Sequence, residues 1–550
     1  MNLPSQPPWG PSGSGTTTGL PPEFEAPAAV FSVPQEERGS KSSTEAASRR
    51  RSIEGLRGRV IELRTCSILG CAIQGHKSSQ GFFACCHGEG LKLATQEPGS
   101  PGDELELEIE ALHDSGEGLA RVGDDLVLVR DAVPGERLRA RITSSGRRFA
   151  RAEPIKRIED SPDRVPARCQ HFGSCGGCDV MTLAYPKQLA WKQERTRKLL
   201  SDSLGEAPPL APIASPEDPW GQRNKLTLHF SSKAGKLRLG LFRPHSRKVF
   251  RMQECPVQHP RAVAAMQRAS LGLSRSGLGV HRQSQGGVLR SLIVRSARST
   301  DSVHLILVTS KMQLPGLEAM HAELAGFERL GLSLLITESP DPSSLDGPHF
   351  HLSGPERLEE EIGGLRYLSS PTAFFQTSPW GAEHLVSRVR DLIDAPEGEE
   401  LVDLYCGGGL LGLAVANRFR RVIGIELDPG AVADAKASAE LNGIQKVSFR
   451  HSAAESLVRD FRFMGKPDTV LLDPPRSGMD PVVLPAVTQQ LAPRRILYVS
   501  CKPETLARDL AKMRSLGYRT LRVEAFDMFP HTQHLEALAL CERIHRVPTT

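Results

Sequence analysis

The residues whose spacing first suggests chemistry form a glycine-rich segment, DLYCGGGLLG, at the end of an apolar run. Gly407, Gly409 and Gly412 stand in a G-x-G-x-x-G frame, in which glycines let backbone amides approach a ligand and direct a helix N-terminus at it. Glu426 follows Gly407 by nineteen residues, at the end of the next apolar run, where a carboxylate can bind two ribose hydroxyls. The pattern alone fits a nicotinamide dinucleotide and S-adenosylmethionine about equally well.

A third apolar run, TVLL, ends in Asp473-Pro474-Pro475-Arg476. An acid followed by two prolines is often only a turn that ends a strand. A dehydrogenase has no use for it at this point, whereas in a methyltransferase the rigid turn forms a wall of the pocket where the methyl acceptor meets the sulfonium. After the glycine segment and Glu426, the turn favours S-adenosylmethionine.

The next apolar run, RILYVS, leads directly into Cys501-Lys502-Pro503. Proline is favoured as the first residue of a helix, so we expect Cys501 at a helix N-terminus beside the same pocket. Helix amides and the positive end of the helix dipole stabilise a thiolate relative to a thiol. A cysteine at the end of a strand is usually a small buried apolar residue, but this position favours a nucleophile.

A thiolate nucleophile implies a methyl acceptor that cannot attack unaided. Carbon 5 of uracil fits, because it is nearly inert until a nucleophile adds at carbon 6. A base must then remove the proton on carbon 5 so that the cysteine can leave. Glu536 in DMFPHTQHLEALAL is the predicted base; His531 and His534 are alternatives that are more typical of turn and packing residues.

Four cysteines outside this region predict a metal centre. Cys169, Cys175 and Cys178 have C-x5-C-x2-C spacing, and Cys255 can complete a four-thiolate site. Both tetrahedral zinc and a four-iron cluster accept four thiolates, so the spacing does not separate them.

The elements that must position these residues follow from the hydrophobic pattern. Residues 369–550 alternate apolar runs with Ala-rich helical segments, which predicts a doubly wound, mostly parallel sheet. Residues 161–368 contain a helix at about 185–200 and several strands, and predict a β-rich α+β domain.

Residues 104–160 alternate apolar and polar residues between glycine-rich turns, which predicts a small antiparallel β-barrel. Basic residues gather on its last two predicted strands, with Glu153 as the only acid among them. They are Arg137, Arg139, Arg141, Arg147, Arg148, Arg151, Lys156 and Arg157. A solvated strand face is one interpretation, but on a small barrel such a stripe favours contact with a phosphate backbone.

Composition limits the class of protein. The chain has 550 residues, of which 39 % are hydrophobic and 24 % charged, and a net charge of +5. No run approaches the roughly 18 apolar residues of a membrane span, no secretory signal is evident, and the eleven cysteines are too sparse for a disulfide scaffold. We therefore expect a cytoplasmic, monomeric protein, with residues 1–103 as a disordered extension because they lack a hydrophobic period.

The motifs together resemble the RNA (uracil-5-)-methyltransferase family. The resemblance covers about residues 104–543 and rests on DLYCGGG, LLDPPRSGM, YVSCKPETLARDL, DMFPHTQHLE and SPTAFFQ. It implies that Cys501 is the nucleophile and Glu536 the base. It also places cofactor contacts on Gln376, Tyr405, Glu426 and Asp473, beside the glycine segment with Gly407 and Gly409.

The resemblance further implies a TRAM RNA-binding barrel at 104–160 and a Rossmann-like methyltransferase domain at 369–550. It favours a central RNA-binding domain at 161–368 with a [4Fe–4S] cluster on its four cysteines. It also favours 23S ribosomal RNA as substrate, because transfer RNA members usually lack both the cluster and the barrel. Transfer RNA is the alternative substrate.

Two residues depart from the family pattern and leave other functions open. Leu410 stands where the family usually has Asn, and the acid or amide after the third strand is replaced near Ala453. A non-catalytic RNA-binding or ribosome-assembly factor is one rival. An amino-group methyltransferase is another, but it would need neither Cys501 nor Glu536.

Overall fold

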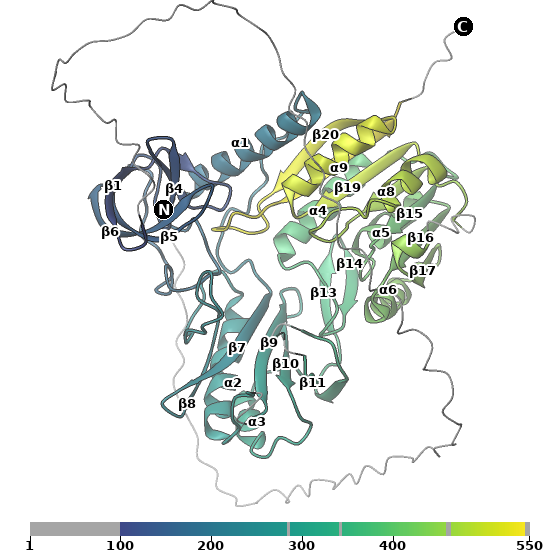
Figure 1. Cartoon of the computed structure of the whole chain (residues 1–550). Helices are drawn as coiled ribbons and strands as arrows, with labels where there is room; N and C mark the ends of the chain where they lie inside the picture. The colour runs from purple at the N-terminus through teal and green to yellow at the C-terminus, as the bar shows by residue number, and fades with distance from the viewer. Residues whose placement is uncertain (1–99, 283–285, 340, 342–343, 458–463, 545–550) are drawn as a thin grey trace, which may run out of the picture. The chain divides into compact units, whose positions relative to one another are not determined.

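The computed structural model describes residues 100–282, 286–339, 341, 344–457 and 464–544 (Figure 1). The disordered extension predicted for residues 1–103 lies, except for its last four residues, outside this described part. Three sheets of six, six and seven strands and one short hairpin make up the β-structure of the described residues.

The first six-stranded sheet is a small barrel-like unit. Its strands are β1 (Glu104–Glu108), β2 (Ala111–Leu112), β3 (Gly118–Val122), β4 (Asp125–Val129), β5 (Arg137–Ser145) and β6 (Ala150–Glu159), in the order β1-β5-β6-β4-β3-β2. Leu138, Ala140 and Ile142 of β5 are buried, while Arg139 and Arg141 between them are exposed, so the period-2 pattern is realised.

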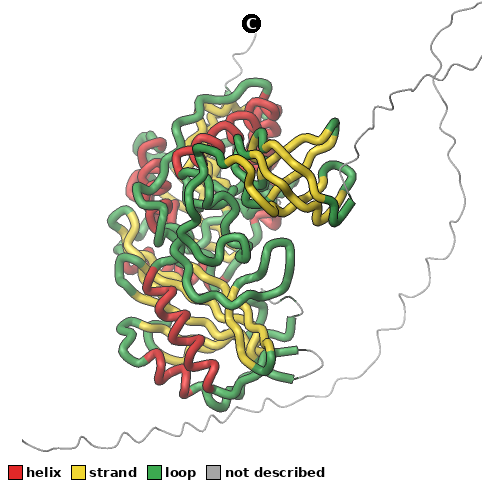
Figure 2. Tube along the Cα trace, turned by 90° about the vertical axis from the view of Figure 1, so that its left-hand side faces the viewer, coloured by secondary structure: helices red, strands yellow, loops and turns green. Residues whose placement is uncertain are grey.

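The second six-stranded sheet occupies the centre of the chain. Its strands are β7 (Lys225–Lys233), β8 (Lys236–Gly240), β9 (Leu289–Ala297), β10 (Ser302–Thr309), β11 (Leu330–Ile336) and β12 (His349–Ser353), in the order β12-β11-β10-β9-β7-β8. The helices α2 (Pro260–Arg275) and α3 (Glu318–Leu324) pack on this sheet through one apolar cluster (Figure 2). β9 and β10 are buried along their whole length, as expected of inner strands.

The seven-stranded sheet confirms the doubly wound prediction. Its strands are β15 (Glu400–Leu404), β16 (Arg421–Glu426), β17 (Val447–His451), β18 (Thr469–Leu472), β19 (Arg495–Ser500), β20 (Tyr518–Phe526) and β21 (Glu536–Arg543). The order is β17-β16-β15-β18-β19-β21-β20; the first five strands are parallel, and β21 is antiparallel to both neighbours.

Helices cover both faces of this sheet. They are α4 (Pro379–Leu392), α5 (Leu410–Val415) with the turn η1 (Ala416–Arg418), α6 (Pro429–Leu441), α7 (Ala454–Leu457), α8 (Val483–Pro485) with the π-helical η3 (Ala486–Leu491), and α9 (Pro503–Ser515). The hairpin β13 (Leu358–Ile362) and β14 (Leu365–Ser369) contributes Ile362 and Tyr367 to the apolar cluster shared with α4, α5 and α6.

The helix α1 (Tyr185–Leu204) belongs to the segment predicted as the central domain, yet it packs on the seven-stranded sheet. Leu200 and Leu204 lie in the same apolar cluster as residues of α9, β19 and β21. In the described residues, no helix is both long and apolar enough to cross a membrane.

Candidate active site

The glycine segment lies where β15 ends and α5 begins, and Glu426 stands beside it at the end of β16. Oε2 of Glu426 accepts a hydrogen bond from the amide of Gly407 (2.9 Å), and Oε1 accepts from the amides of Leu427 (2.7 Å) and Asp428 (2.8 Å). Gly409 has φ +81°, a conformation that side-chain-bearing residues rarely adopt. The loop and the carboxylate predicted to hold a cofactor are therefore adjacent.

The two departures from the family pattern have different structural outcomes. Leu410 is buried in the apolar cluster shared with α4 and α6, and its carbonyl accepts a hydrogen bond from the hydroxyl of Tyr367 (3.0 Å). Two residues past Ala453, the exposed Glu455 accepts a hydrogen bond from the hydroxyl of Tyr405 (3.3 Å). Glu455, which the sequence analysis missed, thus brings a carboxylate to the predicted cofactor residue Tyr405.

The register between β19 and β21 brings the two predicted reacting groups together. Ser500 is paired with Ala537 in this antiparallel ladder. Continuing the register by one residue sets Cys501, which follows Ser500, opposite Glu536, which precedes Ala537. In a regular pair of this kind the Cβ atoms lie about 5 Å apart. Cys501 is separated by one residue from Pro503, the first residue of α9, as predicted.

The charges around this pair shift its protonation. Burial raises the pKa of Cys501 to about 11, the negative charge of Glu536 adds to the increase, and the Arg476 guanidinium opposes it. Burial and the charge of Asp473 raise the pKa of Glu536 well above its usual range. The stabilisation of a Cys501 thiolate by the helix N-terminus stays a prediction, and in the protein without ligands burial and the charge of Glu536 act against it.

Asp473 follows β18 directly and lies close enough to influence both groups. Its side chain is half-buried, and desolvation together with the charge of Glu426 raises its pKa to about 7. Arg476, three residues later, lies beside His534, with 3.0 Å between its Nη2 and Nδ1 of the histidine. The DPPR turn thus contributes both an acid and the cation that faces Cys501 and Glu536.

Gln376, the remaining predicted cofactor residue, precedes α4. It is buried, and its carbonyl accepts a hydrogen bond from the side-chain amide of Asn224 (3.1 Å), which directly precedes β7.

The two alternative bases are His531 and His534, which lie in the loop before β21. His531 is buried at φ +66°, and its ring stacks on Trp220 with centroids 4.0 Å apart. Burial lowers the pKa of both His531 and His534 to about 4. The turn and packing roles of the two histidines stay predictions: His531 packs on Trp220, whereas His534 lies beside Arg476.

The loop that leads into Glu536 is held by α1 through a buried ion pair. Nζ of Lys192 lies 2.6 Å from Oδ1 of Asp527, both side chains are fully buried, and the same ammonium donates to the carbonyls of Phe529 (3.2 Å) and His534 (2.8 Å). The hydroxyl of Tyr185 donates to Oδ2 of Asp527 (2.9 Å). The sequence analysis missed the helical spacing of Gln188, Lys192 and Thr196. These polar residues follow one another at intervals of four and therefore lie on the buried face of α1.

The cysteine segment is hydrogen-bonded to the same loop. The amides of Asp179 and Val180 donate to the carbonyl of His531 (2.9 and 3.1 Å), and Oδ2 of Asp179 accepts from the amide of Gln533 (3.2 Å). Residues next to Cys178 therefore help to position the segment that carries Glu536.

The four predicted metal-binding cysteines line one small cavity. All four are free thiols, and burial raises the pKa of each. They are Cys169, Cys175, Cys178 and Cys255. Among the described residues, no group of three or more His, Cys, Asp or Glu side chains is arranged to hold a metal ion.

The predicted basic stripe of the small barrel is largely neutralised by ion pairs. Arg137 pairs with Glu106 and Glu159, and Arg139 and Arg141 both pair with Glu104. Arg151 pairs with Glu117. Arg157 pairs with Asp131 and Glu136. The partners come from outside the stripe, so the sequence count of charges overstated the free positive charge.

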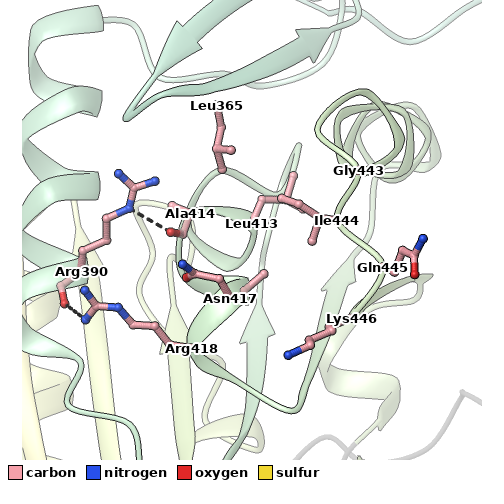
Figure 3. Close-up of a pocket in the computed structure, with 11 residues that line it drawn as sticks. Leu365, Arg390, Leu413, Ala414, Asn417, Arg418, Gly443, Ile444, Gln445 and Lys446 are labelled. Carbon is pink, nitrogen blue, oxygen red and sulfur yellow. Dashed lines mark hydrogen bonds between the residues drawn. The ribbon is translucent and has the colours of Figure 1, made fainter.

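A cavity of about 730 Å³ has none of the predicted site residues in its lining, and Figure 3 shows the residues that do line it. It is lined by residues at the end of α5 and by the turn before β17, so it adjoins the amino ends of the parallel strands. The candidate active site occupies the opposite, carboxyl edge, where ligands of doubly wound sheets bind.

Comparisons with known proteins give the family of the chain. Residues 356–544 match the family model described as tRNA (Uracil-5-)-methyltransferase, and residues 100–155 match the TRAM domain. An RNA methyltransferase of Geobacter sulfurreducens is 35% identical over 82% of this chain and 92% of its own length, and one of Thermosynechococcus vestitus is 36% identical over 80% and 98%.

A solved structure is also similar along most of the chain. It is the tRNA (uracil-54, C5)-methyltransferase of Pyrococcus abyssi in complex with S-adenosyl-L-homocysteine, at 27% identity and a TM-score of 0.64, and the match covers 79% of this chain and 99% of that one.

Proposed function

Because the chain belongs to the tRNA (uracil-5-)-methyltransferase family and carries a TRAM domain, we propose that it methylates carbon 5 of a uridine in structured RNA through a covalent adduct with Cys501. The observation that carries the proposal is the β19–β21 register, which sets Cys501 opposite Glu536 beside the DPPR turn. An amino-group methyltransferase would need neither residue, and a non-catalytic RNA-binding factor would need no such pairing.

The proposed reaction assigns one task to each residue. The Cys501 thiol first gives its proton to solvent; the thiolate sulfur then forms a bond to carbon 6 of uracil, and the carbon 5–carbon 6 double bond opens to an enolate. S-adenosylmethionine, when bound, supplies the methyl group that carbon 5 takes. Glu536 then accepts the proton of carbon 5, the double bond returns, and the bond between carbon 6 and sulfur breaks to release the thiolate. Arg476 lowers the pKa of both reacting groups.

The cofactor contacts proposed for this reaction surround the same edge of the sheet. Glu426 and the glycine loop, with Gly407 and Gly409, are placed for the ribose and the amino-acid part of the cofactor. Gln376, Tyr405 and Asp473 complete the predicted set, and Glu455 joins it through its hydrogen bond with Tyr405.

The covalent mechanism is tested by replacing the base while keeping its shape. Glu536→Gln cannot accept the proton, so the variant should methylate once and remain bonded to RNA. On a denaturing gel this is a slow protein–RNA band that forms only with S-adenosylmethionine, and RNA with 5-fluorouridine should trap the unmodified enzyme in the same way. The double variant Cys501→Ala/Glu536→Gln is the control and should form no band. Normal turnover by Glu536→Gln would refute the role of Glu536.

The RNA class has two candidates. The resemblance favours 23S ribosomal RNA, because the chain combines a TRAM domain with the four cysteines. The long match to the Pyrococcus abyssi transfer RNA enzyme favours transfer RNA, since it extends beyond the methyltransferase region. Mass-spectrometric mapping of 5-methyluridine in both RNAs from a deletion strain decides between them: the RNA that loses the modification is the substrate.

We further propose that the four cysteines hold a [4Fe–4S] cluster. Support comes from their donor chemistry: four free thiols line one cavity, and the positive charge of Arg223 acts on three of them. Anaerobically purified protein should contain about four irons and matching sulfide per chain, and Cys255→Ala should lose them. One stoichiometric zinc in a colourless protein would overturn this assignment.

A further inference from the structure

A second cavity, of about 710 Å³, lies beside the β7–β8 hairpin of the central sheet. Its lining contains six Lys and Arg side chains and no Asp or Glu. The six are Lys233, Arg238, Arg247, Lys248, Arg282 and Arg290. None of the candidate active-site residues lines it, so this basic pocket is a separate feature of the chain.

Three exposed cations of the basic pocket lack the acidic partners that most arginines of the TRAM barrel stripe have. Lys233, Arg247 and Lys248 are exposed, and none of them forms an ion pair with a carboxylate of the described residues. One acid near the pocket is Asp341, which acts on the pKa of His229 and Arg290 and whose carbonyl accepts a hydrogen bond from Arg290. A polyanion would therefore meet free cations here, whereas five arginines of the barrel stripe already have acidic partners.

Two buried side chains of the pocket lack part of their hydrogen bonding. His229 and Arg290 are only 6 % and 8 % exposed, and Nδ1 of the first and Nε of the second have no partner in the described structure. Buried polar atoms are normally paired, so such atoms at a cavity indicate a ligand with polar groups of its own. Burial lowers the pKa of His229, so the imidazole is neutral at pH 7 and offers a hydrogen bond rather than a charge.

An aromatic surface adjoins these groups. The ring of Phe242 stacks on that of His229, with centroids 4.1 Å apart and an angle of 12° between the planes, and both residues line the pocket. Cations combined with an aromatic platform are the features with which proteins bind single-stranded nucleic acid.

We propose that the basic pocket binds a phosphodiester segment of the RNA substrate outside the target uridine. The inference rests on the proposed function in taking RNA as the substrate, and it adds a binding subsite to it. Asn224, which contacts Gln376 of the candidate active site, precedes β7, and His229 and Lys233 lie five and nine residues further along the strand. At about 3.4 Å per residue, the pocket begins about 17 Å and extends to about 30 Å from Asn224.

The test compares two variants that each remove three exposed positive charges. Lys233→Ala/Arg247→Ala/Lys248→Ala removes them from the basic pocket, and Lys436→Ala/Lys446→Ala/Lys466→Ala removes them from the methyltransferase region as a matched control. Binding of a fluorescent 30-nucleotide oligouridylate is measured by anisotropy over a range of salt concentrations, without cofactor. Circular dichroism verifies that both variants fold.

The pocket variant should raise Kd at least tenfold at 0.15 M salt. It should also reduce the slope of log K against log salt by about 2, since each phosphate contact of a single strand contributes about 0.7. The control should change Kd less than threefold. Equal losses in both variants, unchanged binding by the pocket variant, or no binding by the unmodified protein would each overturn the proposal.

This binding experiment is independent of methyl transfer. If the covalent mechanism fails, the oligonucleotide result still tests the pocket, and if the pocket fails, the Cys501 adduct still tests the mechanism. Competition with polyglutamate of equal charge distinguishes an RNA site from a general polyanion site. Displacement of the oligonucleotide by polyglutamate would show a general polyanion site and refute recognition of RNA.

Discussion

Replacing Lys192 with methionine tests whether the buried ion pair with Asp527 holds the loop that leads to Glu536. Both side chains are fully buried at 2.6 Å, so the substitution leaves the Asp527 carboxylate without its cation inside the protein. Breaking a buried pair in this way costs about 3–5 kcal/mol. The substitution also removes the hydrogen bonds that Lys192 donates to the carbonyls of Phe529 and His534, so the loop is held less firmly.

The expected result is a lower melting temperature and a slower reaction. A loss of about 3–5 kcal/mol corresponds to about 6–20 °C for a cooperative unit of 150–250 residues, at roughly 2–4 °C per kcal/mol. Scanning calorimetry measures the first effect, and methyl transfer at saturating RNA measures the second as a fall in kcat, because the loop positions the proposed base.

The double variant Lys192→Met/Asp527→Asn is the control. Removing both charges avoids an unpaired buried ion, so it should recover most of the lost stability. Asp527→Asn alone should cost less than Lys192→Met, because burial already lowers the pKa of Lys192 and the ammonium can lose its proton. A Lys192→Met variant that loses under 1 kcal/mol, or a double variant no more stable than it, would refute this account of the loop.

Three further predictions concern the glycine loop and the reacting pair. Alkylation of Cys501 by iodoacetamide in the protein without ligands should accelerate with pH up to about 11, and Glu536→Gln should shift the midpoint downward by removing a negative charge; a midpoint near 8.5 would contradict the burial argument. Because the pKa of Glu536 is raised on folding, the folded state becomes less stable as pH rises above the usual pKa of a glutamate. The melting temperature of Glu536→Gln should therefore equal that of the unmodified protein near pH 4 and exceed it near pH 8. The opposite trend in calorimetry would refute this prediction. Gly412→Ala should destabilise the protein by about 1–3 kcal/mol in thermal melts, since the new Cβ would lie 2.8 Å from Oδ2 of Asp403. The control Gly408→Ala should not destabilise it, because no atom lies within 4 Å of the new Cβ. Equal melting temperatures of the two variants would contradict this expectation and show that the loop can relax.

Local patterns were sufficient to predict the elements that carry the site. Apolar runs ending in glycine, acid or cysteine predicted β15, β16, β18 and β19, and Pro503 predicted the start of α9, because strand period, turn chemistry and helix capping depend on neighbours in sequence. The chemistry of uracil methylation then connected Cys501 and Glu536 in one reaction, and the family resemblance implied the same roles.

Tertiary structure alone decided which charges are free, which side chains are buried and how the reacting groups ionise. Five arginines of β5 and β6 are paired with acids such as Glu104 and Glu117, which lie on other segments, whereas Lys233, Arg247 and Lys248 of the basic pocket form no ion pair with the described residues. Lys192 is 335 residues from Asp527 in sequence, and only packing makes them a pair. The pKa of Cys501 is raised for the same reason: desolvation and neighbouring charges depend on contacts between distant segments, which no local pattern encodes.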